Sequence, residues 1–403
     1  MKFKTKKLGL LTNLRAGIGF PNAFQGKQNE QIPFYKVGDI SREFQRHNYY
    51  LQEADNYVSY EDLELLKGKL FEAETIVFAK VGEALKLNRR CILTKPALID
   101  NNVFGIKSNS KELDNKYLFY YLLTVNLAEI CRTGAVPSVN QSDVNSISIP
   151  LPDSIEEQQE IVHVLDTMSD IIRLREECIS HAQDLIPALF QEMFKQYINQ
   201  KDKYISIGSV TSDTKQINPS KIFDTDFYYI DIASINNDFG IIETPKIINI
   251  NNAPSRARKL VQANDVIISM TRPYLKGFSI VPERLDGQIA STGFSVLRSL
   301  PEKLSPLYLF AYVRTDMFVE QLIPKMKGAN YPAVRDSDVR SVKIPFPPIE
   351  LQELFAQKAI EIESYIKEQQ EELENAKQMF QSLLHHAFTG ELTRHKFGGD
   401  ING

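Results

Sequence analysis

A chain of 403 residues, 43% of them hydrophobic, can bury sizeable cores, and its length fits two or three folding units. No apolar run approaches the roughly 18 residues of a membrane span, and no hydrophobic segment with a cleavage site follows the lysine-rich start, so we expect a cytoplasmic protein without membrane contact. The cysteines Cys91, Cys131 and Cys178 are widely spaced and odd in number, which favours reduced, buried thiols over disulfides or a metal site.

The net charge of −4 conceals two kinds of segment. Residues 1–150 carry 20 Lys and Arg against 16 Asp and Glu, and residues 200–345 carry 19 against 15. Residues 151–199 carry 3 against 10, and residues 346–403 carry 5 against 10. This alternation is compatible with nucleic acid on the basic segments and a protein partner on the acidic ones.

The first 150 residues have a mixed pattern of short strands and helices. Residues 32–40 predict a strand and a turn, residues 74–80 predict an apolar strand that leads into a basic loop, and a helix is expected near residues 116–131. The segment closes on Ile149-Pro150-Leu151-Pro152. Because proline cannot continue a strand ladder but suits the approach to a helix, this motif marks the end of a globular domain.

A long helix is predicted next. Its apolar residues follow alternating steps of four and three, interrupted only by Arg175, which is the period of a coiled-coil seam. The helix is expected to span about 40 residues, or roughly 60 Å, with a kink or an end at Pro187. The seam consists of Ile161, Leu165, Met168, Ile172, Ile179, Ala182, Ile186, Leu189 and Met193.

The second half of the chain repeats this order. Residues 227–235 resemble residues 32–40, residues 264–270 resemble residues 74–80, and a helix is expected near residues 307–322. Residues 328–347, which end in Ile344-Pro345-Phe346-Pro347, repeat residues 134–152. Such internal similarity predicts a tandem duplication of one module: a globular domain, a proline boundary and a long helix.

The second helix has the same period, with Gln369 as its polar interruption. Two copies of one seam can face each other antiparallel around a pseudo-twofold axis, although amphipathic helices that each pack on their own domain would have a similar pattern. The seam consists of Ile362, Ile366, Leu373, Ala376, Phe380, Leu383 and Ala387.

We therefore expect a mixed α/β protein with two similar globular domains separated by two long antiparallel coiled-coil helices. The expected division is 1–150 for the first domain, 151–199 for the central helix, 200–345 for the second domain, 346–392 for the C-terminal helix and 393–403 for a tail.

Catalytic and metal-binding motifs are not recognisable in the sequence. The segment Gly19 to Gln28 fails as a phosphate loop because six residues separate its glycines and Gln28 replaces Ser or Thr. His385 and His386 are adjacent on a helix and lack the i, i+4 spacing of metal ligands. We expect no catalytic residue, cofactor site or metal site in this chain.

The duplicated proline boundaries and the ending Phe388-Thr389-Gly390-Glu391-Leu392 resemble the DNA-specificity subunits of type I restriction-modification systems, over nearly the whole chain. The resemblance implies a non-catalytic subunit with two target-recognition domains, each reading one half of a split target in double-stranded DNA, and helices that fix the gap. It also implies two modification subunits, which bind S-adenosylmethionine and methylate adenine, and restriction subunits that use ATP and Mg²⁺.

Candidate DNA contacts come from charge and loop position, because arginine and amide side chains can read purine edges while lysine more often contacts phosphates. Lys80 aligns with Met270 and Gly82 with Arg272, so the two half-sites are expected to differ. The first domain offers Lys80, Lys86, Asn88, Arg89, Arg90, Ser138, Asn140 and Gln141. The second offers Thr271, Arg272, Tyr274, Lys276, Tyr331 and Arg335, with Arg256, Arg258 and Lys259 as phosphate contacts.

Two other functions remain open on the sequence alone. The chain could be a scaffold whose helices only assemble a complex, in which case the complex would lack salt-dependent DNA binding. It could also be a methyltransferase or nuclease with unrecognised motifs, in which case the purified chain would be active with S-adenosylmethionine or magnesium.

Overall fold

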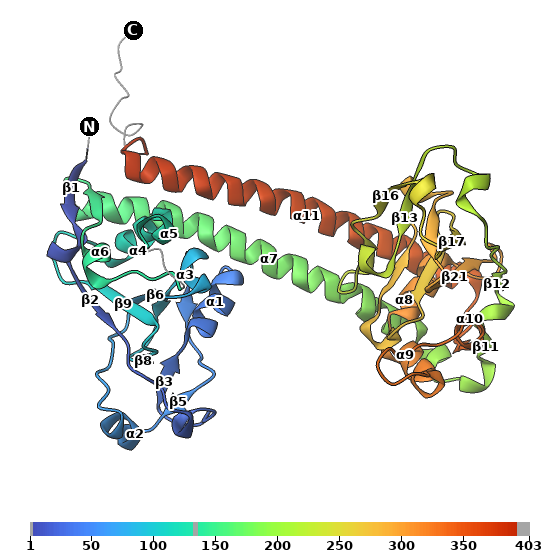
Figure 1. Ribbon diagram of the computed structural model, residues 1–403, viewed down its shortest axis with the longest axis horizontal. Coiled ribbons are helices and arrows are strands. Elements are labelled where there is room, and N and C mark those ends of the chain that lie inside the picture. Colours follow the sequence, from blue (N-terminus) through green and yellow to red (C-terminus); the bar gives the residue numbers. More distant parts are fainter. Residues whose placement is uncertain (1–2, 132–135, 393–403) are drawn as a thin grey trace, which may run out of the picture. The chain divides into compact units, whose positions relative to one another are not determined.

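The computed structural model describes residues 3–131 and 136–392 as two compact units (Figure 1). Unit 1 comprises residues 1–178 and 369–403, and unit 2 comprises residues 179–368. The tail expected at 393–403 lies outside the described residues. None of the described helices is long and apolar enough to cross a membrane.

Unit 1 contains two main sheets and a short two-stranded sheet. The larger sheet has the order β2 (Thr12–Ala16), β9 (Val103–Ser108), β6 (Ile76–Ala79), β7 (Arg90–Leu93), β4 (Tyr50–Leu51). The smaller has the order β5 (Tyr57–Val58), β3 (Ile32–Tyr35), β8 (Leu98–Ile99), in which β3 and β8 are parallel. Strand β1 (Lys4–Lys7) pairs with β10 (Ser148–Leu151), which holds the start of the chain beside the proline boundary.

Apart from the two long helices described below, the helices of unit 1 are short. They are α1 (Val37–Gln45), α2 (Tyr60–Leu65), α3 (Glu83–Lys86), α4 (Asn115–Thr124), α5 (Leu127–Ile130) and α6 (Gln141–Asn145), with 3-10 turns at Leu8–Leu10 and Asn22–Phe24. The helix expected near residues 116–131 is thus two helices, because Val125 has an extended backbone and ends α4.

Unit 2 has two four-stranded sheets and two short ones. One main sheet has the order β12 (Thr211–Ser212), β21 (Phe294–Ser299), β18 (Val266–Ser269), β19 (Phe278–Ile280). The other has the order β16 (Lys246–Asn249), β13 (Asp226–Ile230), β20 (Ile289–Ser291), β17 (Ala257–Leu260), with β13 and β20 parallel. The short sheets are β11 (Ile205–Ser206) with β22 (Lys343–Ile344), and β14 (Ile235–Asn236) with β15 (Ile241–Ile242).

The helices of unit 2 include α8 (Pro306–Val313), α9 (Asp316–Leu322) and α10 (Asp336–Arg340). The helix expected near residues 307–322 is again divided, between α8 and α9. Short 3-10 turns lie at Lys201–Lys203, Ile207–Ser209, Pro219–Lys221, Ile232–Ser234, Ile250–Asn252, Pro273–Leu275, Glu283–Leu285 and Ile323–Lys325.

Buried hydrogen bonds of the same kind occur in both units. Gln158 accepts from the backbone N–H of Asp114 at 2.9 Å, and Gln352 accepts from that of Ser305 at 3.0 Å. Gln158 also donates to the backbone carbonyl of Glu112, and Gln352 donates to that of Lys303. Both glutamines are buried. In each unit this joins the start of a long helix to the residue that precedes α4 or α8.

One tyrosine in each unit continues this correspondence. Tyr117 and Tyr308 each donate to the carbonyl of the second proline-boundary residue, Pro150 or Pro345, at 2.8 Å. Burial of their hydroxyls raises the pKa of both tyrosines. The proline boundaries are therefore held by the same side chains in both units.

The two long helices are α7 (Ile155–Ile198, 44 residues) and α11 (Ile349–Thr389, 41 residues), close to the expected length. Helix α7 continues through Pro187, so of the two expected outcomes, a kink or an end of the helix, the end is wrong. A proline removes one backbone donor, but packing of the flanking Ile186 and Leu189 on the unit 2 core stabilises the helical backbone.

Each unit buries part of both long helices. In unit 1, Ile161 and Leu165 of α7 belong to the same core as Phe380 and Ala387 of α11. In unit 2, the ring of Phe190 in α7 lies 5.6 Å from that of Phe355 in α11, edge to face. Most apolar residues of the predicted seams thus lie in, or pack against, the cores of the units. Nearer the middle of the helices, Ile179 and Ala182 are buried, and Ile362 and Ile366 are half-buried.

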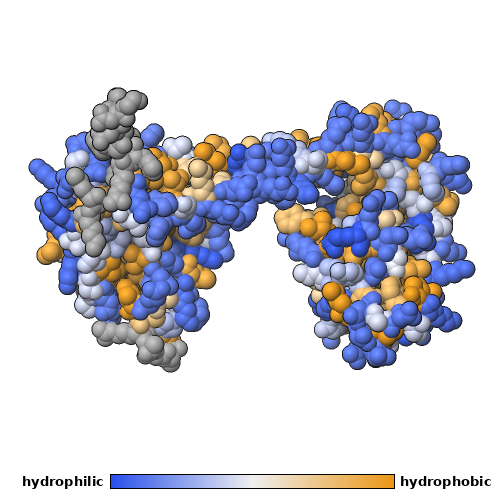
Figure 2. Space-filling view, turned by 90° about the horizontal axis from the view of Figure 1, so that it is seen from above, coloured by the Kyte–Doolittle hydropathy of each residue, from blue (hydrophilic) through white to orange (hydrophobic). Residues whose placement is uncertain are grey.

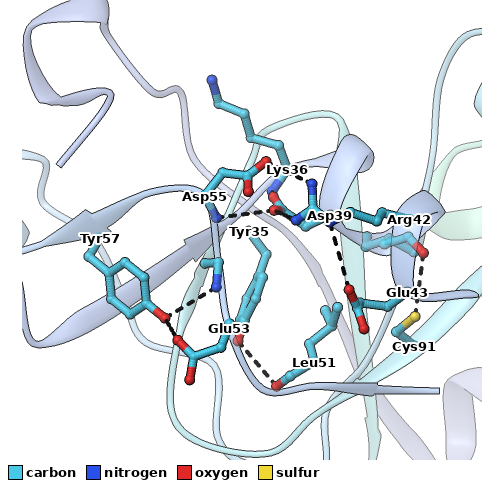
Figure 3. A network of polar contacts seen from close by, with 12 residues as sticks. Tyr35, Lys36, Asp39, Arg42, Glu43, Leu51, Glu53, Asp55, Tyr57 and Cys91 are labelled. Atoms are coloured by element: carbon cyan, nitrogen blue, oxygen red, sulfur yellow. Dashed lines mark hydrogen bonds and ion pairs between the residues drawn. The ribbon is translucent and has the colours of Figure 1, made fainter. Parts of the chain in front are cut away.

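A polar network joins α1 to the segment that precedes β5 (Figure 3). The buried carboxylate of Asp39 accepts from the backbone N–H of Lys36 at 2.7 Å and from the guanidinium of Arg42 at 2.8 Å. Arg42 also donates to Asp55 at 2.8 Å, and the backbone N–H of Asp55 donates to Asp39 at 3.2 Å. These bonds satisfy a backbone donor at the start of α1 and pair the buried Asp39 carboxylate, so the network has a structural role.

The three cysteines are free, as expected, but they are not all buried. Cys91 is buried, Cys131 is half-buried and Cys178 is exposed on α7. The expectation of buried thiols is therefore wrong for Cys178.

Exposed apolar side chains occur on both long helices. The space-filling view shows hydrophobic residues interspersed with hydrophilic ones on the visible face of both units (Figure 2). The large apolar side chains exposed on α7 and α11 are Val164, Leu174, Leu185, Leu354, Ile360, Tyr365 and Met379.

Candidate nucleic-acid interface

In unit 1, the loop after strand β6 is joined to the loop between α5 and α6. We call them the strand-end loop (residues 80–89) and the proline loop (residues 136–141). The N–H of Gly82 donates to the carbonyl of Pro137 at 2.8 Å, and the N–H of Val139 donates to that of Lys80 at 3.0 Å. An antiparallel bridge links Val81 with Ser138. Main-chain bonds therefore bring together two loops that are far apart in the sequence.

Unit 2 makes the same junction with its own strand-end loop (residues 270–277) and proline loop (residues 330–335). The N–H of Arg272 donates to the carbonyl of Pro332 at 2.8 Å, and the N–H of Val334 donates to that of Met270 at 2.9 Å. Thr271 bridges Ala333. These contacts support the alignment of Lys80 with Met270 and of Gly82 with Arg272.

Each proline loop ends in a short helix with the same capping arrangement. The backbone N–H of Asn140 donates to the Asp143 carboxylate at 3.0 Å at the start of α6, and that of Arg335 donates to the Asp338 carboxylate at 2.8 Å at the start of α10. The caps place the side chains of Asn140 and Arg335, both exposed, at equivalent points.

Most polar candidates of unit 1 lie at the joined loops. The Lys80 ammonium lies 5.2 Å from the centre of the Phe104 ring, and the Lys86 ammonium pairs with Glu83 at 2.9 Å. Gln141 donates to the carbonyl of Leu14 at 2.8 Å, which holds its amide against strand β2. Arg89 and Ser138 are half-buried.

Arg90 is a core residue, so the structure does not support its assignment as a DNA contact. Its side chain is completely buried and donates to the carbonyls of Asn88 and Val125, both at 2.7 Å. Burial lowers the pKa of Arg90 to about 9, which leaves it charged at neutral pH. The side-chain oxygen of Asn88 accepts a third hydrogen bond from the Arg90 guanidinium, at 2.8 Å, and is thereby turned inward.

The register of the sheets explains the burial of Arg90. Arg90 begins β7 and pairs with Phe78, whereas Phe278 begins β19 and pairs with Ile268. Arg90 thus occupies the position that a buried phenylalanine has in unit 2. The sequence run of Asn88, Arg89 and Arg90 gave no sign of which arginine faces inward.

In unit 2 the side chains at the loop junction are more exposed. Tyr331 is 71% exposed and Tyr274 is 45% exposed. The Arg272 guanidinium lies 4.7 Å from the centre of the Tyr331 ring, within the range of a cation–π contact. The Lys276 ammonium pairs with Asp316 at 2.7 Å, and Thr271 is half-buried.

The structure does not bring the three predicted phosphate contacts to the loop junction. Arg256 precedes β17 and is exposed, whereas Arg258 and Lys259 lie within β17, in the other sheet of unit 2. Lys259 is 8% exposed, and the Arg258 guanidinium donates to the carbonyl of Ala257 at 2.7 Å. A strand residue whose side chain faces the core is a poor phosphate contact, so Lys259 is disfavoured in that role.

Sequence reasoning missed two residues at this junction. Lys327 exchanges two backbone hydrogen bonds with Ala333, both of 2.9 Å, so residues 327–333 form a small hairpin. Lys327 and Asn330 are both exposed on it. The sequence feature that could have indicated them is the position of Lys327 directly before Gly328, the glycine that begins the repeated segment.

Among residues 3–131 and 136–392 there is no group of three or more His, Cys, Asp or Glu side chains that could hold a metal ion. The Nδ1 atom of His386 lies 2.6 Å from a Glu391 carboxylate oxygen, and His385 is exposed.

Comparisons with known proteins agree with the geometry. Residues 1–181 match the family model described as "Type I restriction modification DNA specificity domain". The chain is 22% identical over 318 residues to the type I restriction enzyme MjaVIII specificity subunit of Methanocaldococcus jannaschii, which covers 72% of this chain and 74% of that protein.

Two solved structures are also similar. The S subunit of a type I restriction-modification system from M. genitalium has a TM-score of 0.52 at 13% identity, over 96% of both chains, which supports the fold. The HsdS subunit of Thermoanaerobacter tengcongensis is 44% identical over 38% of this chain and 40% of that chain, with a TM-score of 0.36. The chain is thus similar to specificity subunits of type I restriction enzymes over most of its length, and its first 181 residues match the model of their DNA specificity domain.

Proposed function

We propose that this chain is the non-catalytic DNA-recognition subunit of a type I restriction-modification complex and that each globular domain reads one half of a bipartite, asymmetric target. The observation that carries the proposal is the repeated loop junction. The bond from Gly82 to Pro137 and the bond from Arg272 to Pro332 have the same length of 2.8 Å and follow equivalent strands. A fold that presents the same two loops twice is suited to two half-sites.

Different side chains at equivalent positions support an asymmetric target. Lys80 corresponds to Met270, Gly82 to Arg272 and Asn140 to Arg335, so the two junctions offer different hydrogen-bond donors. Since bases are distinguished by the donors and acceptors at their edges, different side chains would select different half-sites. The proposed contacts of the first domain are the exposed or half-buried Lys80, Lys86, Arg89, Ser138, Asn140 and Gln141. Those of the second are Thr271, Arg272, Tyr274, Lys276, Tyr331 and Arg335, with Arg256 on a phosphate.

The proposed architecture is a tandem duplication, with domains at 1–150 and 200–345 and spacer helices at 151–199 and 346–392. The equivalent hydrogen bonds of Gln158 and Gln352 and of Tyr117 and Tyr308 support a common origin of the two modules. In this arrangement the helices pair antiparallel as a coiled coil, and helix length sets the gap between half-sites.

The proposed partners are double-stranded DNA, two modification subunits and restriction subunits. The exposed apolar side chains of α7 and α11, among them Leu185 and Tyr365, together with the acidic charge of those segments, support protein docking there. S-adenosylmethionine would belong to the modification subunits and ATP with Mg²⁺ to the restriction subunits, with none of them bound by this chain. Since cellular DNA is the ligand, the proposed location is the cytoplasm.

The test is to express this chain with its modification subunit and to locate methylated adenines across the host genome by single-molecule sequencing. A bipartite, asymmetric motif with a constant gap, which disappears when this chain is deleted, is the expected result. Unchanged methylation after deletion, in a complex shown to assemble, would contradict the proposal and favour the scaffold. Methyl transfer by the purified chain alone would instead identify an enzyme.

A further inference from the structure

Arg272 has a backbone conformation that is unfavourable for a residue with a side chain. Its φ is 48° and its ψ is 58°, in the left-handed region. The equivalent residue of unit 1 is Gly82, which also has a positive φ, of 78°, but has a ψ of −173°, in a region that glycine alone adopts readily. Glycine enters the left-handed region without penalty, whereas a residue with a Cβ atom is destabilised there because its Cβ atom approaches the following carbonyl oxygen. Unit 2 thus carries an arginine where the same junction in unit 1 has the residue that the backbone favours.

The turn that precedes the same strand does not show this difference between units. Glu74 and Asn264 are the equivalent residues that precede β6 and β18, with φ values of 66° and 69°. Their N–H groups make equivalent bonds, to Leu93 at 2.7 Å and to Val281 at 2.8 Å. That turn is left-handed without glycine in both units, so it is a shared structural feature, whereas the strain at Arg272 belongs to unit 2 alone.

The side chain of Arg272 is held in a fixed position. Its guanidinium lies 4.7 Å from the centre of the Tyr331 ring, and Nη2 donates to the carbonyl of Asn330 at 3.0 Å. Its Nε is buried without a hydrogen-bond partner within the described residues. The remaining donors of Nη1 and Nη2 are sufficient for two parallel hydrogen bonds to a ligand.

The surroundings of this guanidinium suit a DNA groove. Tyr331, Asn330 and Lys327 are exposed on the hairpin of residues 327–333. Within the described part of the chain no carboxylate forms an ion pair with Arg272, so its charge is not neutralised there. A rigid, charged side chain beside an exposed aromatic ring and an exposed lysine has the composition of a base-reading element flanked by a phosphate contact.

Resting on the proposed function, we propose that Arg272, positioned by Tyr331, determines specificity in the second domain by reading the major-groove edge of one guanine. The O6 and N7 atoms of guanine accept the two parallel hydrogen bonds of an arginine better than any other base edge does. Strain is retained at a functional position because a glycine there, as in unit 1, would leave that base unread.

The experiment compares methylation motifs of the intact complex carrying wild type, Arg272→Gly or Arg272→Lys. For Arg272→Gly, we expect the methylation motif to lose its preference for guanine at one position of one half-site, so that any base is accepted there. The gap and the other half-site should be unchanged. Discrimination at that position should fall about tenfold or more, the order expected for a bidentate pair. Arg272→Lys should keep part of the preference, because lysine retains the charge but not the planar pair of donors.

Asn264→Gly is the matched control, since it relieves the same backbone conformation at the other end of β18 and should leave the motif unchanged. Arg272→Gly should melt at or above the temperature of the wild type, because glycine tolerates this φ. An unchanged motif in Arg272→Gly would overturn the inference while leaving the proposed function intact. The proposed function itself is tested separately: it fails if deletion of the whole chain leaves methylation unaltered.

Discussion

Arg175 and Gln369, the two polar residues that interrupt the apolar periods of the long helices, contact each other in unit 1. The Arg175 guanidinium donates to the Gln369 side-chain oxygen at 2.8 Å and also pairs with Glu372. One step further along α7, Glu176 pairs with Lys377 of α11 at 2.8 Å. Polar residues at equivalent seam positions of two helices can fix their register, because any shift would leave a charge against apolar side chains.

The pairing predicts a measurable coupling between the two helices. A double-mutant cycle with Arg175→Ala and Glu372→Ala should give a coupling free energy of about 0.5–1 kcal/mol, since both side chains are partly exposed. The coupling should decrease at high salt. Urea unfolding at two salt concentrations measures it, and a cycle between Arg173 and Glu372 serves as the control. Additive effects of the two alanines would contradict the pairing.

Gln352 should be important for the stability of unit 2. Its buried amide accepts from the backbone N–H of Ser305 and donates to the carbonyl of Pro347 at 2.8 Å. Gln352→Ala would leave these buried groups without partners, which costs about 1–3 kcal/mol for each. Unfolding by urea should show a loss of at least 2 kcal/mol, with Gln158→Ala similar in unit 1. Gln378→Ala, on the exposed face of α11, should change stability little.

The ion pair of Lys27 and Asp62 predicts a loss of stability in acid. The hydrogen bond from Lys27, at 2.7 Å, holds the pKa of Asp62 below its usual value of 3.8. A carboxyl with a lowered folded-state pKa contributes stability above its usual pKa and loses it as the pH falls through the folded-state value. Asp62→Asn should therefore lower the melting temperature at pH 7. The difference from wild type should shrink below about pH 3.8, and a constant difference would contradict the pair's role.

The three free cysteines should react in the order of their exposure. Cys178 is exposed and should be labelled first by a thiol reagent, followed by the half-buried Cys131. Burial raises the pKa of Cys91, so its reactive thiolate should form only after unfolding. Mass spectrometry of the native protein over time measures the order, and Cys178→Ser is the control that should remove the first product. Early labelling of Cys91 would contradict its placement in the core.

The proposed spacer role predicts that helix length controls the target. Insertion of one heptad into each long helix within the seam keeps the apolar face, because seven residues complete nearly two turns. Methylation should then occur at a motif with the same half-sites and a longer gap. A four-residue polar insertion in the loop of residues 237–239 is the control and should leave the gap unchanged. An unchanged gap in the heptad variant would contradict the spacer role.

The sequence by itself determined the features that depend on local periodicity. The apolar period of residues 155–198 required a long helix with one buried face, and the repeated proline motifs required two similar chain boundaries, because helical spacing and proline geometry act between neighbours in the chain. The repeats also predicted a second long helix and the correspondence of Gly82 with Arg272. The mixed α/β character was predicted from the pattern of short strands and helices.

Only the tertiary structure decided which charged residues face inward and which loops meet. Arg90 is buried because β7 pairs with β6 in a register that turns it toward the core, and Lys259 is buried within β17 in the same way. The stacking of Arg272 on Tyr331 depends on a bridge between residues 271 and 333. Strand pairing joins residues that are distant in the chain, and a shift of one residue reverses every side chain, so spacing alone could not fix these outcomes.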